Sequence, residues 1–151
     1  MRNKRVYWFT GQPGSGKTVL ALLLKKHLEE KYKEKVFHID GDDLRSLFNN
    51  MKYDKDGRET NIQRAQDVAK FVHNDGYDVI VSMVSPYKEI REQFKEEMGM
   101  DIMEIYVHTL NQRGREHFHI DNYEEPTHNF INIDTTDILP KDSLIQLLDL
   151  I

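Results

Sequence analysis

Short apolar runs alternate along the chain with longer segments in which apolar residues recur every three or four positions. The short runs, which are rich in β-branched and aromatic residues, predict five strands. These strands are expected at residues 6–10, 36–39, 79–84, 102–107 and 130–133. The third run, VIVSMV, is almost entirely apolar, which is typical of a strand buried on both faces of a sheet.

The longer segments predict five helices, at residues 18–31, 42–49, 59–74, 88–97 and from Pro140 to the end of the chain. The third helix carries a core-facing stripe of Ile62, Ala65, Ala69 and Val72. The last helix has an apolar side formed by Leu144, Ile145, Leu147, Leu148 and Ile151. Residues 52–57, KYDKDG, are expected to form a turn-rich loop.

This alternation of strands and helices predicts an α/β fold with a five-stranded parallel sheet and helices on both faces. We expect a single domain over residues 1–151. Ligands of such sheets bind at the carboxyl ends of the strands. Residues 111–128 are polar, irregular and long for a loop in so small a domain, and loops of this kind are usually functional or disordered.

Composition narrows the classes of protein further. The 151 residues include no Cys, which excludes disulfides, thiolate metal sites and cysteine nucleophiles. No signal peptide or run of about 18 apolar residues is present, so we expect a soluble, cytoplasmic protein without a membrane partner. The net charge of -5 argues against a broad nucleic-acid surface, although a local basic groove stays open. Trp8 and the Met residues are assigned to the core.

The most specific motif is GQPGSGKT, which fits the phosphate-binding P-loop pattern G-x-x-x-x-G-K-[ST]. Glycines let backbone N–H groups converge on phosphate oxygens, and the helix that follows adds its positive end. Lys17 can reach the β- and γ-phosphates of ATP, and Thr18 can ligate Mg²⁺. The predicted ATP-binding residues are Gly11, Gln12, Pro13, Gly14, Ser15, Gly16, Lys17 and Thr18.

A P-loop alone fits a kinase, an NTPase or a GTPase-type switch. The guanine-reading pattern N-K-x-D does not occur, and the buried strand at residues 79–84 carries no Asp to order the metal. Asp40, directly after the second predicted strand, could supply that carboxylate instead. Such a placement suits a small-molecule kinase, in which the carboxylate orders Mg²⁺ or accepts the proton of the attacking hydroxyl.

A cluster of charges follows the second strand, in the order Asp40, Gly41, Asp42, Asp43, Leu44 and Arg45. Its plain interpretation is a helix N-cap with acidic residues in the first turn. Capping explains one or two of the Asp residues, but it requires neither Gly41 nor Arg45. We therefore favour an acceptor site for this cluster.

Two further segments hold candidate ligand contacts. Arg58, Asn61 and Arg64 recur at three-residue steps on the third predicted helix, where periodicity alone would favour a solvated helix face. Ser85 stands directly after the third strand, at the edge of the sheet where ligands bind.

Taken in order, these motifs resemble the adenylylsulfate (APS) kinase family. The matching segments are GQPGSGKT, IDGDDLR, the pattern R-x-x-NI-x-R that starts at Arg58, and VSPYK, which contains Val84 and Ser85. The resemblance covers about residues 5–110. It implies a P-loop NTPase three-layer sandwich of the small-molecule kinase type that phosphorylates the 3'-hydroxyl of adenosine 5'-phosphosulfate with MgATP.

The resemblance also implies roles for particular residues. Lys17, Asp40 and Ser85 would be catalytic, and Thr18 and Asp40 would hold Mg²⁺. The acceptor would be bound by Asp42, Arg45, Tyr53, Arg58, Asn61, Val84, Ser85 and Phe118. Ser85 is interpreted as an acceptor contact, because in-line phosphoryl transfer needs no covalent intermediate.

The lid at about residues 111–128 departs from the family pattern. Roughly a dozen basic residues are absent before it, Glu116 replaces an expected lysine, and His119 replaces a T-G pair. Two alternatives therefore stay open: a kinase of another hydroxyl, such as a nucleoside, modified base, polynucleotide end or small metabolite, and a non-catalytic nucleotide-binding protein. His117 and His119 are assigned to an exposed loop in preference to a metal site. A homodimer stays open.

Overall fold

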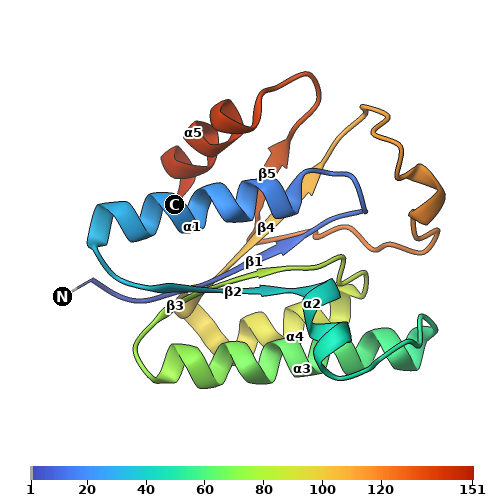
Figure 1. The fold of residues 1–151 in the computed structure, drawn as a ribbon, viewed down its shortest axis with the longest axis horizontal. Coiled ribbons are helices and arrows are strands. Elements are labelled where there is room, and N and C mark those ends of the chain that lie inside the picture. The colour runs from blue at the N-terminus through green and yellow to red at the C-terminus, as the bar shows by residue number, and fades with distance from the viewer. Residues whose placement is uncertain (1) are drawn as a thin grey trace.

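A five-stranded parallel sheet forms the centre of the structure, a computed structural model in which residues 2–151 are described (Figure 1). The strands are β1 (Val6–Thr10), β2 (Val36–Asp40), β3 (Asp78–Ser82), β4 (Ile102–His108) and β5 (Ile131–Asp134). Their order across the sheet is β2-β3-β1-β4-β5, and every neighbouring pair is parallel. The predicted fold class is confirmed.

Helices cover both faces of the sheet (Figure 1). They are α1 (Lys17–Tyr32), α2 (Gly41–Leu47), α3 (Lys55–Asn74), α4 (Lys88–Met98) and α5 (Pro140–Leu150), with two short 3₁₀ turns, η1 (Gly99–Asp101) and η2 (Glu116–Phe118). Buried side chains of α1 and α5, such as Leu24 and Leu147, pack with Phe9 on one face of β1. On the other face, Ile62 of α3 and Phe94 of α4 pack with Trp8. Alternate residues of β1 thus enter opposite cores, as strand geometry requires.

Four details of the sequence-based prediction are wrong. The loop at residues 52–57 is too long, because α3 begins at Lys55, where the Asp54 side chain accepts a hydrogen bond from the Gly57 N–H at 2.8 Å and caps the helix. The third strand ends at Ser82, two residues before its predicted end. Ile145 is 59% exposed, so it lies outside the buried side of α5. Met51 and Met100 are exposed too, whereas Met83 and Trp8 lie in the core as expected.

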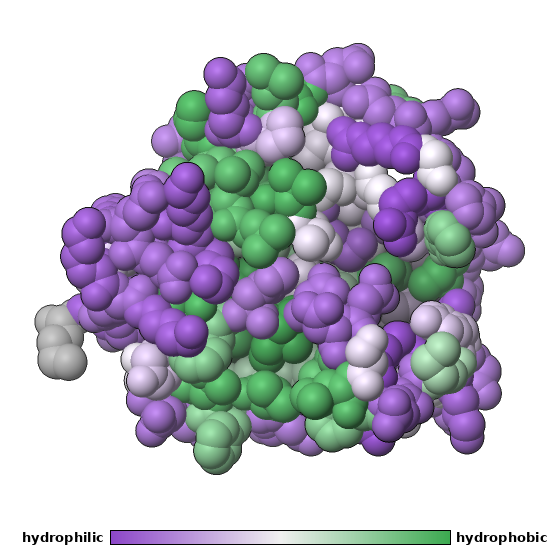
Figure 2. All heavy atoms as spheres, in the orientation of Figure 1, coloured by the Kyte–Doolittle hydropathy of each residue, from purple (hydrophilic) through white to green (hydrophobic). Residues whose placement is uncertain are grey.

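The surface in the orientation of Figure 1 is mostly polar, with apolar side chains gathered in separate groups (Figure 2). Exposed apolar residues on α1 include Val19 and Leu22. Within residues 2–151, no helix combines the length and the apolar character needed to cross a membrane.

Candidate active site

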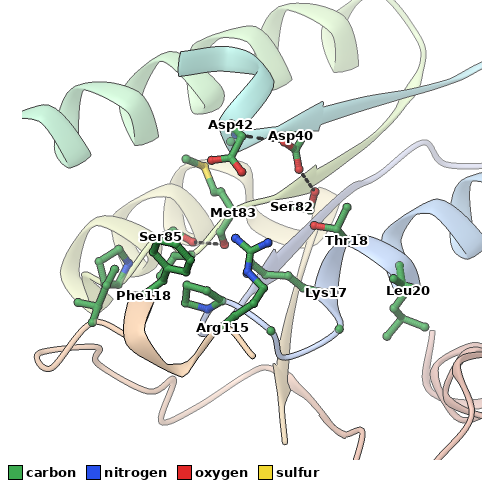
Figure 3. Close-up of a pocket in the computed structure, with 18 of the residues that line it drawn as sticks. Lys17, Thr18, Leu20, Asp40, Asp42, Ser82, Met83, Ser85, Arg115 and Phe118 are labelled. Atoms are coloured by element: carbon green, nitrogen blue, oxygen red, sulfur yellow. Dashed lines mark hydrogen bonds between the residues drawn. The ribbon is translucent and has the colours of Figure 1, made fainter. Parts of the chain in front are cut away.

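A cavity of about 1120 Å³ opens at the carboxyl ends of the strands. Its walls come from the P-loop, the start of α2, α3, the segment after β3, residues 113–120 and the start of α5. The strand order changes direction around β1, where open parallel sheets place their ligands. Segments far apart in sequence therefore meet around one space (Figure 3).

The P-loop forms the floor of this cavity. Gly14 and Gly16 have φ angles of 84° and 101°, a left-handed conformation that residues with a Cβ rarely adopt. A Cβ on Gly14 would also lie 3.2 Å from the Cβ of Arg115. Of the eight predicted ATP-binding residues, those that line the cavity are Pro13, Gly14, Gly16, Lys17 and Thr18.

Lys17 is a buried cation at the P-loop, with 8% of its surface exposed, the same fraction as for Arg45. Its Nζ donates a hydrogen bond to the Gln12 backbone carbonyl oxygen at 3.2 Å. The pKa of Lys17 is lowered to about 8, mainly by burial and further by the nearby Arg115 guanidinium, while Asp42 and Asp40 oppose the shift. Removing a charged ammonium from water is unfavourable. A bound anion would compensate, so Lys17 suits a phosphate oxygen.

Asp40 both caps a helix and lines the cavity. It is the N-cap of α2, and its Oδ2 accepts hydrogen bonds from the N–H groups of Asp42 at 3.1 Å and Asp43 at 3.3 Å. Its Oδ1 accepts a hydrogen bond from the Ser82 hydroxyl at 3.3 Å, and the carboxylate faces the cavity beside Thr18 (Figure 3). Capping fixes the rotamer, so the carboxylate is held in place before any ligand arrives.

The Ser82 hydroxyl also lies 2.7 Å from Nε2 of His38, so a chain of hydrogen bonds runs from the side chain of His38 to Asp40. Burial lowers the pKa of His38, and the carboxylates of Asp40 and Asp43 oppose this shift. Ser82 was not among the residues predicted from the sequence.

On the acceptor side, Asn61 carries a buried oxygen atom that accepts no hydrogen bond from the described residues. Its Nδ2 donates to the Gly41 carbonyl oxygen at 3.2 Å, whereas its buried Oδ1 has no partner among the described residues. A buried acceptor without a donor is costly. Because Asn61 lines the cavity, a bound hydroxyl or N–H group can satisfy it.

Arg45 lines the cavity but is largely committed to the loop after α2. Its guanidinium donates to the carbonyl oxygens of Asn50 at 3.1 Å and Lys52 at 2.7 Å. It also lies 4.2 Å from the ring centre of Tyr53. Arg45 thus holds Tyr53 at the cavity, which gives it a positioning role in addition to any direct contact with an acceptor.

The other predicted acceptor residues line the cavity, whereas Arg64, which belongs to the same sequence motif as Arg58, does not. Asp42, Arg58 and Val84 line the cavity, as do the aromatic residues Tyr53 and Phe118, which are 58% and 57% exposed. Two half-exposed rings at one cavity suit a nucleobase, because bases stack on aromatic side chains. Arg64 is elsewhere: its guanidinium lies 4.5 Å from the Phe48 ring centre, outside the cavity lining.

Ser85 also lines the cavity, but its hydroxyl is bonded within the protein. Its Oγ accepts a hydrogen bond from Nε1 of Trp8 at 2.9 Å and donates to the Met83 carbonyl oxygen at 3.3 Å. Its φ of 39° is unusual for a residue with a Cβ, and Arg91 fixes the turn by donating to the Ser85 carbonyl oxygen at 2.6 Å. These contacts favour a positioning role over the predicted catalytic one.

Comparison with known proteins gives this arrangement a family. The family model described as "Adenylylsulphate kinase" matches residues 3–133. The chain belongs to the adenylylsulfate kinase family. It is 42% identical over 103 residues to a protein described as a probable adenylyl-sulfate kinase from Pyrococcus abyssi. The aligned residues cover 67% of this chain and 58% of that protein. The chain therefore spans little more than half the length of such relatives.

A second relative matches more of the chain. A cytidine diphosphoramidate kinase from Campylobacter jejuni is 30% identical over 147 residues, covering 95% of this chain and 85% of that protein. Among solved structures, a Mycobacterium tuberculosis APS kinase mutant superposes with a TM-score of 0.78 at 25% identity, with 99% of this chain and 98% of that chain covered. The predicted P-loop kinase fold is thus confirmed.

The lid of this family member contributes residues that sequence reasoning missed. Arg113 and Arg115 line the cavity, and Arg115 extends towards Lys17 and the acceptor side (Figure 3). The Arg113 guanidinium donates to the carbonyl oxygens of Gly14 and Thr135, both at 3.1 Å. The signal in the sequence was the RGR segment itself, which carries two cations in a loop opposite a phosphate site.

One of the lid histidines contacts the P-loop. In the described part of the chain, no group of three or more His, Cys, Asp or Glu residues has the geometry to hold a metal ion. His119 instead places its Nε2 3.1 Å from the Pro13 carbonyl oxygen. This contact joins the lid to the P-loop.

Proposed function

We propose that this chain is an ATP-dependent kinase that transfers the γ-phosphoryl group of ATP to the 3'-hydroxyl of adenosine 5'-phosphosulfate. The proposal rests on one observation: the same cavity is lined by Lys17 on the P-loop and by Asp40 at the end of β2. A protein that only held a nucleotide would need the first group but not the second. Family membership supports the choice of acceptor.

The P-loop is the donor half of the site. Its backbone N–H groups and the start of α1 would bind the β- and γ-phosphates, and Lys17 would neutralise charge on the transferred group. Binding a polyanion would keep Lys17 protonated above the pKa of about 8 that it has without one.

Asp40 and its surroundings are the acceptor half. Asp40 would accept the proton of the attacking hydroxyl as the new P–O bond forms and the bond to the leaving ADP oxygen breaks. Its two capping bonds and the Ser82 bond hold the carboxylate in one orientation. Asn61 and Arg58 would bind the ribose and the anionic end of the acceptor, and Tyr53 and Phe118 would flank the base.

The residues present fit Mg²⁺. The hydroxyl of Thr18 and the carboxylate of Asp40 lie at the same end of the cavity (Figure 3), and oxygen donors are those that Mg²⁺ prefers. Mg²⁺ sites of kinases typically use one or two protein ligands and complete the shell with phosphates and water, so the absence of a larger acidic cluster within residues 2–151 is compatible. When bound, the ion would neutralise phosphate charge.

A second candidate acceptor is cytidine diphosphoramidate. The relative of that name matches this chain over 95% of its length, whereas the match to the adenylyl-sulfate kinase from Pyrococcus abyssi covers 67%. The longer match extends beyond the segment that holds the P-loop and the Asp40 and Ser85 motifs. The shortened lid follows this segment in the sequence. A nucleotide with a different base and anionic end therefore remains the alternative to adenosine 5'-phosphosulfate.

The deciding experiment measures ADP release with MgATP and each of the two acceptors in turn. We expect turnover with adenosine 5'-phosphosulfate to give a 3'-phosphorylated product, and we expect Lys17→Ala to lower this turnover at least about a hundredfold. Turnover only with cytidine diphosphoramidate would move the assignment to the second acceptor. Tight ATP binding without turnover on either acceptor would support the non-catalytic alternative.

A cytoplasmic location stays a prediction.

A further inference from the structure

The side chain of Gln12, in the second position of the P-loop, points to the lid instead of the cavity. Its Nε2 donates a hydrogen bond to the Ile120 carbonyl oxygen at 2.7 Å, and the Ile120 N–H donates to its Oε1 at 2.9 Å. One carboxamide thus satisfies both backbone groups of a residue 108 positions away. Gln12 is not among the residues that line the cavity.

The part of the lid that carries Arg115 has few other contacts to hold it in place. Further along the lid, the Glu124 N–H donates a hydrogen bond to the Pro86 carbonyl oxygen at 2.9 Å, and the Tyr123 hydroxyl lies 2.8 Å from that of Thr10. Residues 112–119 are all exposed, so burial of apolar surface contributes little to the position of this segment. Its other contacts with the P-loop are single hydrogen bonds: Arg113 to the Gly14 carbonyl oxygen and His119 to that of Pro13, both at 3.1 Å. Among the described contacts between the lid and the P-loop, the Gln12–Ile120 contact is the one in which two hydrogen bonds join the same two residues, and paired bonds add geometric specificity.

What the lid brings to the cavity is Arg115. Its guanidinium extends towards Lys17 (Figure 3), close enough to lower the pKa of that lysine. Within residues 2–151, the Arg115 side chain has no hydrogen-bond or ion-pair partner; it lies 5.5 Å from the Phe118 ring centre. A free guanidinium beside the phosphate-binding lysine is placed to meet a phosphoryl group.

We propose that Gln12 is a positioning residue that latches the short lid onto the P-loop and thereby sets Arg115 over the transferred phosphoryl group. The role in transfer rests on the proposed function. The latch itself does not, because it is a contact between two parts of the chain. Gln12 stays a predicted ATP-binding residue through its backbone, and this role concerns its side chain alone.

The latch has a kinetic consequence. If only the closed form transfers phosphate, the observed rate is the rate of that form multiplied by the fraction of molecules that are closed. ADP binding should depend far less on the latch, because P-loop backbone groups and the start of α1 supply most of it. Loss of the latch should therefore lower kcat much more than it weakens ADP binding.

The first test follows the latch without any turnover. In Gln12→Met, which keeps the length of the side chain but not its hydrogen bonds, we expect the Ile120 amide to exchange with solvent at least about tenfold faster than in the wild type. Trypsin should also cleave faster after Arg113 and Arg115. The matched control is Gln63→Met, an exposed glutamine on α3 that bonds only Asp67, and it should change neither rate.

The second test connects the latch to Arg115. We expect Gln12→Met to lower kcat about tenfold while the Kd of ADP stays within about threefold. Arg115→Met should lower kcat at least as much, and the double variant should be no slower than Arg115→Met alone, because both changes remove the same contact.

Two outcomes would overturn the latch. One is unchanged Ile120 exchange in Gln12→Met. The other is an ADP Kd that rises about tenfold in parallel with the fall in kcat, which would assign Gln12 to the nucleotide. If the wild type transfers phosphate to neither acceptor, the proposed function fails, and the Ile120 exchange rate still decides whether the latch exists.

Discussion

The cavity has two walls that are built in different ways. The strand-edge wall consists of the P-loop, the Asp40 turn and the Ser85 turn, each of which follows directly from the end of β1, β2 or β3. The lid wall, residues 111–128, contains one short 3₁₀ turn and is held by polar contacts to distant residues. In the first wall, local structure places each side chain. In the second, long-range contacts do.

Because of this difference, we expect the two walls to contribute differently to the reaction. The strand-edge wall holds Lys17 and Asp40, and its position is fixed by the buried sheet beneath it. The lid wall holds Arg115 and Phe118, which line the cavity from an exposed segment. Loops on a rigid scaffold can change with little effect on the fold. We therefore expect substitutions in the strand-edge wall to stop the reaction, and those in the lid wall to change its rate and acceptor preference.

The largest effect is expected at Asp40. Asp40→Asn retains a side-chain oxygen that can cap α2, but it removes the base, so kcat should fall by roughly 10²–10⁴ while ATP affinity changes little. Steady-state kinetics with an ADP-release assay measures kcat. Calorimetric titration with a non-hydrolysable ATP analogue measures the nucleotide affinity. A near-normal kcat would mean that another group accepts the proton. It would also contradict the expectation that substitutions in the strand-edge wall stop the reaction.

Lys17 should come next. Lys17→Ala removes the cation nearest the transferred phosphoryl group, and loss of one such interaction typically costs about 10²–10³ in kcat. The fold should survive, which circular dichroism can verify, because the P-loop glycines and the β1 core are untouched. Activity within tenfold of the wild type would mean that Lys17 does not contact the transferred group.

The division between the walls also explains how much the sequence could predict. The five strands were found because the sheet is buried and its runs are apolar, and Gly14, Gly16 and Lys17 follow a local motif. Arg115 and the second role of Gln12 were missed because they depend on contacts across 108 residues or on the position of an unpatterned loop. The Trp8 bond to Ser85 has no local signal either, since it joins residues 77 positions apart.

A smaller effect is expected in the lid wall at Phe118. Phe118→Leu keeps an apolar side chain but removes the ring, and a stacked base contributes about 1–3 kcal/mol. The acceptor KM should therefore rise about tenfold, with kcat nearly unchanged, in assays at saturating ATP. Tyr53→Leu, on the other side of the base, is the matched variant. If neither substitution changes the acceptor KM, the base binds elsewhere in the cavity.

The smallest effect concerns stability and joins the two walls at Lys17. Its pKa of about 8 in the folded protein lies below the ordinary value of 10.5. Between these two values the unfolded chain binds more protons, so the free energy of unfolding contributed by Lys17 rises with pH through that window. Below pH 8 the cost of burying the charged ammonium is fully present, and above about pH 10.5 it is gone.

Lys17→Met should therefore stabilise the protein at pH 7, by about 3 kcal/mol at most, and raise Tm by several degrees. The gain should shrink as the pH rises from 8 to 10.5. Since the Arg115 guanidinium adds to the shift, the gain should also be smaller in an Arg115→Met background. Thermal unfolding of the four proteins across this pH range tests both statements. A gain that is independent of pH would mean that Lys17 is not buried as a charge, and a gain that is independent of Arg115 would mean that the lid does not close over the P-loop in solution.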